Sequence, residues 1–265
     1  MIKRGHFLPG GTLLTDDKGV NETYRGTIEV GPSRIDAYVK LMSGRQLVNE
    51  LAASVLGRLV GLRMPRAFLV LVRQSDYSHS PAVQAASGDV IAFATEAVGS
   101  GSALRRVTLN SPAAFALFLK SWKEWPEAAT FDEWIANADR HPGNVLIGQF
   151  GEVWLIDHSH AFTGPSWNAA TLNPLVFVPN QLCDHASKCI SLADRFNAYA
   201  AALNVSALFA VINAENALRT AYIDQQVNTA DFSALASFVA LRASKPYEAI
   251  SVRLGLPGLS LGAPA

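Results

Sequence analysis

Two acidic residues, Asp139 and Asp157, stand where this chain could carry out chemistry. Asp139 begins the run Asp-Arg-His-Pro-Gly-Asn, so Asn144 follows it by five positions, after a Pro-Gly turn. Residues 145–147 are expected to form a strand, and residues 153–156 a returning strand that ends at Asp157. Such a hairpin brings both polar clusters to the same end. One carboxylate can then orient an attacking hydroxyl, while a second carboxylate and an amide oxygen bind Mg²⁺ on nucleotide phosphates. We therefore predict that Asp139, Asn144 and Asp157 are catalytic, with the last two as the metal ligands.

The spacing Asp-x-x-x-x-Asn does not identify this site by itself, because it occurs three times in the chain. Only one of the pairs is followed by an expected strand, a turn, a second strand and another aspartate. The interpretation therefore depends on context. The pairs are Asp16/Asn21, Asp132/Asn137 and Asp139/Asn144.

The two segments around these aspartates resemble the catalytic and metal-binding segments of the HipA-like kinases, which are bacterial relatives of protein and phosphoinositide kinases. The segments read Asn-Ala-Asp-Arg-His-Pro-Gly-Asn-Val-Leu-Ile and Trp-Leu-Ile-Asp-His-Ser-His-Ala-Phe. The similarity is sparser towards the amino terminus and thins out after Phe162. Aminoglycoside and choline phosphotransferases carry a similar run, but usually with Gly before the Asp and Leu after it. Here Ala138 and Arg140 flank Asp139, which favours the HipA-like interpretation. The resemblance implies ATP and Mg²⁺ as cofactors.

Residues 3–42 are expected to be rich in β-structure, and Gly10, Gly11 and Thr12 lie in a loop between two apolar stretches. Backbone N–H groups of such a loop can approach a phosphate closely, because glycine has no Cβ. An ordinary hairpin turn explains the same residues equally well. HipA-like chains often carry Gly-Gly-Ser or Gly-Gly-Thr here, so the resemblance favours phosphate binding.

Lys40 lies near the end of a strand expected at residues 35–41, and a helix is expected to follow. Ser43 and Gln46 fit a capping box that would begin this helix, and Gly61 can end it. Glu50 lies one turn into the helix. An ion pair between Lys40 and Glu50 would hold the lysine ammonium against the nucleotide phosphates. The alternative is that both are solvated surface residues.

Further strands are expected at residues 66–73 and 90–95, with an exposed loop at residues 75–88 between them. Residues 95–102 then form a glycine-containing link. The resemblance implies that the backbone at Glu96 and Val98 contacts the adenine ring.

Helical periodicity follows the link. Ser111-Pro112 can begin one helix, and a capping box at Thr130 to Glu133 can begin another that leads to Asp139. Later helices are expected near residues 186–203, 206–222 and 231–242, with an irregular end from Gly255. We therefore predict an α+β, two-lobed, protein-kinase-like fold, with a β-rich small lobe at residues 1–96 and a mainly helical large lobe at residues 97–265.

Composition limits the partners. The chain has 22 basic and 22 acidic side chains, so no electrostatic footprint for nucleic acid is expected. Cys183 and Cys189 match no zinc pattern and are interpreted as reduced, which favours the cytoplasm. The start of the chain runs into Pro-Gly-Gly, so no signal peptide is expected. No apolar run approaches the roughly 20 residues of a membrane span, and no membrane partner is expected. The resemblance adds an antitoxin-like protein as a candidate partner.

The predicted reaction is transfer of the γ-phosphoryl group of ATP to a hydroxyl acceptor, with a protein serine or threonine preferred to a small molecule. Three alternatives stay open: a small-molecule phosphotransferase of the aminoglycoside or choline type, a nucleotide-binding scaffold without turnover, and a metal hydrolase. The last would use His141, His158 and His160, but their spacing matches no clean metal motif. We expect His141 to orient the loop and the other two to pack or hydrogen-bond around it.

Overall fold

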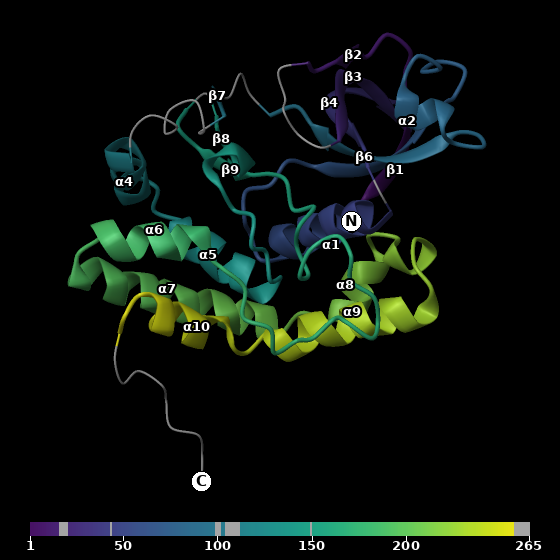
Figure 1. Ribbon diagram of the computed structural model, residues 1–265. Helices are drawn as coiled ribbons and strands as arrows, with labels where there is room; N and C mark the ends of the chain where they lie inside the picture. Colours follow the sequence, from purple (N-terminus) through teal and green to yellow (C-terminus); the bar gives the residue numbers. More distant parts are fainter. Residues whose placement is uncertain (16–20, 43, 99–101, 104–111, 149, 257–265) are drawn as a thin grey trace.

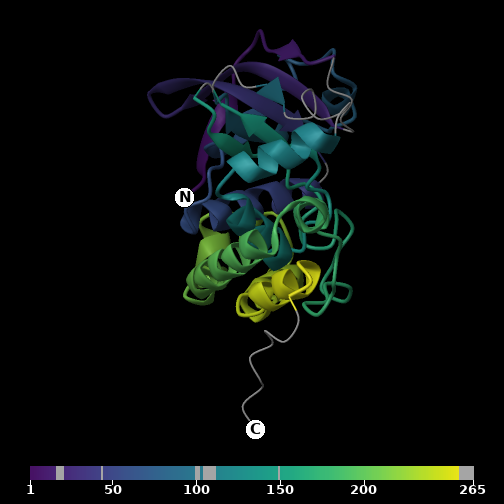
Figure 2. The same cartoon turned by 90° about the vertical axis from the view of Figure 1, so that its left-hand side faces the viewer.

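The computed structural model describes the chain except for residues 16–20, 43, 99–101, 104–111, 149 and 257–265. It combines a six-stranded sheet, a three-stranded sheet and a set of helices (Figure 1). The predicted mixed α+β architecture is therefore present. The large sheet lies at one end of the molecule and most helices at the other, with α1 (Gly44–Leu59) between them (Figures 1 and 2).

The large sheet has the order β1-β5-β6-β4-β3-β2, and β1 also pairs with β3, so five of its strands close on one another. Closure leaves few unpaired strand edges. All of its pairings are antiparallel except that of β1 with β5. Its strands are β1 (Lys3–Phe7), β2 (Thr12–Leu13), β3 (Glu22–Val30), β4 (Ser33–Leu41), β5 (Ala67–Val72) and β6 (Val90–Glu96). The small sheet contains β7 (Ser102–Ala103), β8 (Val145–Ile147) and β9 (Val153–Leu155).

Alternation along β5 divides its side chains between two hydrophobic cores. Phe68, Val70 and Val72 belong to a core formed by the side chains of the sheet itself. Ala67 and Leu69 belong to the larger core, which α1 shares with the helical part of the chain. The helix that carries Glu50 is thus fixed between the sheet and the other helices.

The helices pack around two buried ones, α1 and α5, on which most side chains are inaccessible to solvent. In α5, Trp134 stacks on Phe209 with ring centroids 4.2 Å apart, and its indole N–H donates to the carbonyl of Val239 at 2.8 Å. No helix within the described ranges is long and apolar enough to cross a membrane. Besides α1, the helical elements are α2 (Pro81–Gln84), α4 (Pro112–Ser121), α5 (Trp125–Trp134), η1 (Pro142–Asn144), α6 (Gln181–Cys189), α7 (Leu192–Ala210), α8 (Ala214–Arg219), η2 (Ile223–Gln225), α9 (Thr229–Arg242) and α10 (Pro246–Arg253).

The predicted capping box at Thr130 is wrong. Helix α5 already begins at Trp125, with Pro126 in its first turn, so Thr130 lies inside the helix. The Thr130 hydroxyl donates to the carbonyl of Pro126 at 2.6 Å, a bond that lets a buried threonine sit within a helix. The cap predicted at Ser43, the cap at Ser111 and most of the irregular end lie outside the described residues.

Two other boundaries also differ from the prediction. The loop at residues 75–88 is not wholly exposed, because Tyr77 is buried against Phe7 and Ser80 caps the short helix α2. The break expected near residue 204 is absent, since α7 runs through it. The chain instead breaks before α7, where Ser191 and Asp194 form a complete capping box, and again between α7 and α8.

Candidate active site

The hairpin of β8 and β9 brings two predicted site residues together, as expected. The strands pair antiparallel, with Val145 opposite Leu155. At the end of the hairpin, the backbone N–H of Ile156 donates to the carbonyl of Asn144 at 3.1 Å. Asn144 therefore lies beside the residue that precedes Asp157.

The turn before this hairpin holds Asp139 against Asn144. The amide nitrogen of Asn144 donates to the Asp139 carbonyl at 2.6 Å and lies 3.4 Å from its carboxylate. His141 accepts a hydrogen bond from the backbone of Gly143 at 3.0 Å and so begins η1, which is the orienting role expected of it. The ring of His160 lies 3.2 Å from the Asp139 carboxylate. That carboxylate is 38% exposed, so an acceptor can reach it.

Lys40 lies between two carboxylates. Its ammonium is 2.9 Å from Asp157 and 3.3 Å from Glu50. Burial is the largest influence on Asp157 and raises its pKa, but the charge and hydrogen bond of Lys40 outweigh it and hold the pKa well below its usual range. Burial likewise lowers the pKa of Lys40, but Glu50 and Asp157 together raise it above its ordinary value. Lys40 and Asp157 are therefore both charged at neutral pH.

Glu50 also fastens α1 to the segment that follows β9. Its side chain is buried, and its second oxygen accepts the backbone N–H of His158 at 2.9 Å. The preceding residue, Asp157, has a φ of 55°, a left-handed conformation that non-glycine residues rarely adopt. The hydroxyl of Ser159 donates to its carboxylate at 2.9 Å. Interactions on both sides thus hold Asp157 in an unfavourable backbone conformation.

Asn49, next to Glu50 in α1, was not predicted from the sequence. It is fully buried, and its amide nitrogen donates to the carbonyls of Ser159 at 2.8 Å and Ala161 at 2.9 Å. Its oxygen accepts the indole N–H of Trp167 at 2.8 Å. Consecutive residues of α1 therefore bind the chain on the carboxyl-terminal side of Asp157.

Arg140 and Asp132 form a buried ion pair behind the site, which was not predicted from the sequence. Two guanidinium nitrogens of Arg140 each lie 3.0 Å from an oxygen of Asp132. A third donates to the carbonyls of Asn144 at 2.9 Å and Ile156 at 2.8 Å. The available signal was the Asp132/Asn137 pair, whose side chains are hydrogen-bonded at 2.9 Å.

The predicted phosphate loop lies between β1 and β2. Gly11 cannot carry a side chain, because a Cβ there would overlap the ring of Phe7 and the hydroxyl of Tyr77. Its N–H donates to that hydroxyl at 3.1 Å. Gly10 has a φ of 91°, which favours glycine, and Thr12 begins β2. Packing therefore accounts for Gly11, and its N–H is already engaged.

The link residues are also described in part. The Glu96 carboxylate binds the guanidinium of Arg66 through two contacts, of 2.5 and 2.7 Å. The backbone N–H of Glu96 donates to the carbonyl of Arg66 at 2.9 Å. Val98 is half-buried, and the next three residues lie outside the described part. The side chain and the backbone N–H of Glu96 are thus both engaged within the protein, so a nucleotide contact at Glu96 would use its carbonyl oxygen.

Comparison with known proteins identifies the family. A family model described as HipA-like kinase matches residues 38–218. The chain belongs to the HipA-like kinase family. The matched range includes Lys40, Glu50, Asp139, Asn144 and Asp157.

A solved structure supports the fold of this HipA-like kinase. It is the crystal structure of a Helicobacter pylori proinflammatory kinase, CtkA, with a TM-score of 0.52 and 12% sequence identity. The alignment covers 95% of this chain and 98% of that one. At this identity, the likeness concerns the fold alone. A search of curated proteins finds no match.

The oxygen atoms at the site suit Mg²⁺ in a HipA-like kinase. Asp157 is ionised and 34% exposed, and Asn144 adds an amide oxygen. Mg²⁺ prefers oxygen ligands and usually binds few protein groups, because water and substrate phosphates supply the rest. Within the described ranges, no three His, Cys, Asp or Glu side chains gather as a transition metal requires. His158 is instead buried beside Phe131, so the three histidines do not form a metal centre.

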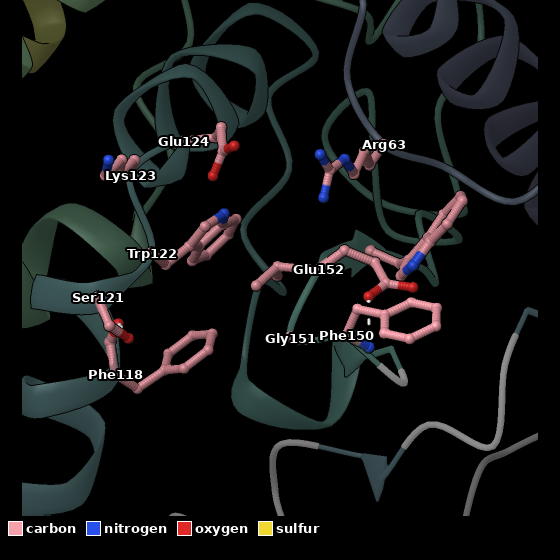
Figure 3. A pocket seen from close by; sticks show the side chains of 11 residues that line it. Arg63, Phe118, Ser121, Trp122, Lys123, Glu124, Phe150, Gly151 and Glu152 are labelled. Atoms are coloured by element: carbon pink, nitrogen blue, oxygen red, sulfur yellow. Dashed lines mark hydrogen bonds between the residues drawn. The ribbon is translucent and has the colours of Figure 1, made fainter.

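Two pockets of this HipA-like kinase lie away from these residues. One, of about 580 Å³, has Phe118 and Trp122 on one side and Arg63, Phe150 and Glu152 on the other (Figure 3). The second, of about 640 Å³, is lined by residues of the large sheet and of η2. In the described part of the chain, neither lining includes the predicted site residues.

Proposed function

We propose that this HipA-like kinase transfers the γ-phosphoryl group of ATP to a hydroxyl group in a Mg²⁺-dependent reaction. The observation that carries the proposal is the contact of Lys40 with both Glu50 and Asp157, at 3.3 and 2.9 Å. These residues come from β4, from α1 and from the end of the β8–β9 hairpin. Three distant segments thus supply one cation and two carboxylates where phosphate and metal would be bound.

Each residue has a distinct role in this scheme. Asp139 would accept a hydrogen bond from the attacking hydroxyl and orient it, since its carboxylate is accessible. Asn144 and Asp157 would hold the metal through their oxygens. Lys40, held by Glu50, would bind phosphate oxygens. When bound, Mg²⁺ supplies positive charge that stabilises the charge developing on the phosphoryl group.

We further propose that residues 1–96 and 97–265 act as the two lobes of a kinase. The placement of the large sheet and the helices at opposite ends supports this division (Figure 1). The link around Glu96 and Val98 would contact adenine through its backbone, and the loop of Gly10, Gly11 and Thr12 would lie near the phosphates. Because Gly11 already donates its N–H to Tyr77, phosphate binding there depends on its neighbours.

The acceptor we propose is a serine or threonine hydroxyl on a protein, and an antitoxin-like protein is a candidate partner. The Asp139 carboxylate is accessible to a protein hydroxyl and to a small-molecule hydroxyl, and the labelling experiment below distinguishes the two acceptors. We also propose a cytoplasmic location, because ATP is available there and Cys183 and Cys189 are free thiols.

The test is incubation with γ-labelled ATP and Mg²⁺, alone and with cell extract. We expect label on protein for the wild type and loss of most transfer in Asp139→Asn, with ATP binding retained. The matched control is Asp89→Asn, an exposed aspartate in the loop before β6, which should transfer normally. Undiminished transfer by Asp139→Asn at an unchanged melting temperature would exclude Asp139 as the catalytic residue.

Two other outcomes separate the alternatives. Wild-type protein that binds ATP but labels nothing would be a nucleotide-binding scaffold. Label that appears only on added aminoglycosides or choline, and not on protein, would identify a small-molecule phosphotransferase.

A further inference from the structure

The guanidinium of Arg140 connects the backbones of two metal-ligand segments. Its side chain is buried, and one nitrogen donates to the carbonyl of Asn144 at 2.9 Å and to the carbonyl of Ile156 at 2.8 Å. Asn144 is itself a proposed metal ligand, and Ile156 directly precedes the other one, Asp157. A single nitrogen thus bridges the two strands of chain from which the metal ligands project.

The opposite edge of the same guanidinium is fixed to α5. Asp132 receives two hydrogen bonds from Arg140, both 3.0 Å long, and a third from Asn137 at 2.9 Å. Asn137 in turn accepts the backbone N–H of Asp139 at 3.3 Å. Because a guanidinium is planar and rigid, its position relative to α5 also sets the position of both bound carbonyls.

We propose that Arg140 is a positioning residue that sets the separation of Asn144 and Asp157, and thereby the affinity of the site for a divalent cation with nucleotide. This inference rests on the proposed function. The competing explanation is a purely structural ion pair. Buried ion pairs are often replaceable by apolar residues without loss of stability, so stability alone does not require this one.

The decisive variant is Arg140→Lys, which keeps the charge but cannot span Asp132 and both carbonyls. The readout is binding of Mn²⁺ to the protein with ATP, followed by electron paramagnetic resonance, beside calorimetric binding of adenosine without metal. We expect Mn²⁺ affinity to fall about tenfold or more, as when other groups that orient metal ligands are removed, while adenosine affinity is unchanged.

The matched control is Arg242→Lys. Arg242 is a half-buried arginine that also donates to backbone carbonyls, at 3.0 Å to Trp134 and at 2.8 Å to both Pro174 and Val176. Those carbonyls do not belong to either metal-ligand segment. Arg242→Lys should therefore lose stability without loss of Mn²⁺ affinity.

A second variant guards against failure of Arg140→Lys to fold. Asp132→Leu combined with Arg140→Met replaces the pair by apolar residues of similar volume, which restores stability in other buried pairs. This double variant should fold, and its Mn²⁺ affinity should be reduced as in Arg140→Lys. Wild-type Mn²⁺ affinity in either folded variant, or an equal loss in Arg242→Lys, overturns the positioning role. A wild-type protein that binds adenosine but no Mn²⁺ with ATP overturns the proposed function together with this inference.

Discussion

The ammonium of Lys40 lies 2.9 Å from a carboxylate oxygen of Asp157 and 3.3 Å from one of Glu50. These contacts join a strand, a helix and the segment after the hairpin. The side chain of Glu50 is buried and that of Lys40 is 19% exposed, so solvent screens the pair only in part. The contacts of Lys40 with Glu50 and Asp157 therefore help to hold α1 against β4 and against the segment after β9.

The first prediction concerns Lys40 and Glu50 as a unit. Lys40→Ala and Glu50→Ala should each weaken ATP binding about tenfold, the equivalent of one charge-assisted hydrogen bond. The double variant should be little worse than either, because the second change has no interaction left to remove. Calorimetric titration with ATP and Mg²⁺ measures all three.

The control for this cycle is the pair Arg25 and Asp36. They are 2.9 Å apart on the neighbouring strands β3 and β4, with both side chains 54% exposed. Alanine at either position should cost at most about 0.5 kcal/mol of stability and leave ATP affinity unchanged. Two results would show that Lys40 and Glu50 do not act together on the nucleotide. One is strictly additive losses of ATP affinity in the double variant, and the other is losses of ATP affinity no larger than those of the control pair.

The hairpin and its aspartates could be predicted because their signals are local. The strand at residues 145–147 follows directly from Val-Leu-Ile after a Pro-Gly turn, and β8 has the same bounds. The pairing of Lys40 with Glu50 was expected from a strand end followed by a helix. These predictions needed only the order of residues along short segments, together with a family resemblance.

The contacts that support the site could not be predicted in the same way. Asn49 binds carbonyls 110 and 112 residues away, and no periodicity in α1 distinguishes it from a solvated asparagine. Arginine and aspartate are rarely fully buried, so the Asp132/Asn137 spacing was a weak sign that Asp132 faces inward, and nothing in the sequence marked Arg140 as buried. Thr130 shows the opposite kind of error. Its local sequence matches a capping box, but the helix already begins at Trp125, so Thr130 lies inside it.

The second prediction concerns Asn49. Asn49→Ala leaves the carbonyls of Ser159 and Ala161 and the indole N–H of Trp167 without their partner, and should cost about 1–3 kcal/mol of unfolding free energy. Because those groups follow Asp157, amide hydrogen exchange in residues 158–167 should accelerate more than exchange in α5. Mass spectrometry of peptic fragments resolves the two regions.

Two variants delimit this effect. Trp167→Phe keeps an aromatic ring but removes the donor to Asn49, so it should produce a smaller acceleration in the same residues. Asn197→Ala, an exposed site on α7, should leave both regions unchanged. Equal acceleration throughout the protein in Asn49→Ala would indicate general destabilisation and would contradict a specific hold on the segment after Asp157.

The last prediction concerns His158, which is buried beside Phe131 and next to Asp157. Burial is the main cause that lowers the pKa of His158. The nearby charge of Arg140 adds to this effect, while Glu50 and Asp132 oppose it. Above pH of about 6.5, the unfolded and folded chains both hold this histidine neutral. Below that pH the unfolded chain takes up the proton more readily, so the folded state loses stability as pH falls.

Urea unfolding at pH 7.5 and pH 5.5 should expose this contribution. Below pH 6.5, the unfolding free energy of the wild type should fall by up to about 1.4 kcal/mol per pH unit relative to that of His158→Gln, because glutamine does not titrate. The control is Asn197→Gln, at an exposed site on α7, and it should keep the pH dependence of the wild type. Parallel curves for wild type and His158→Gln would mean that His158 accepts its proton as easily when folded as when unfolded. The segment beside Asp157 would then have to open to water in the folded protein, in conflict with the burial of both His158 and its partner Glu50.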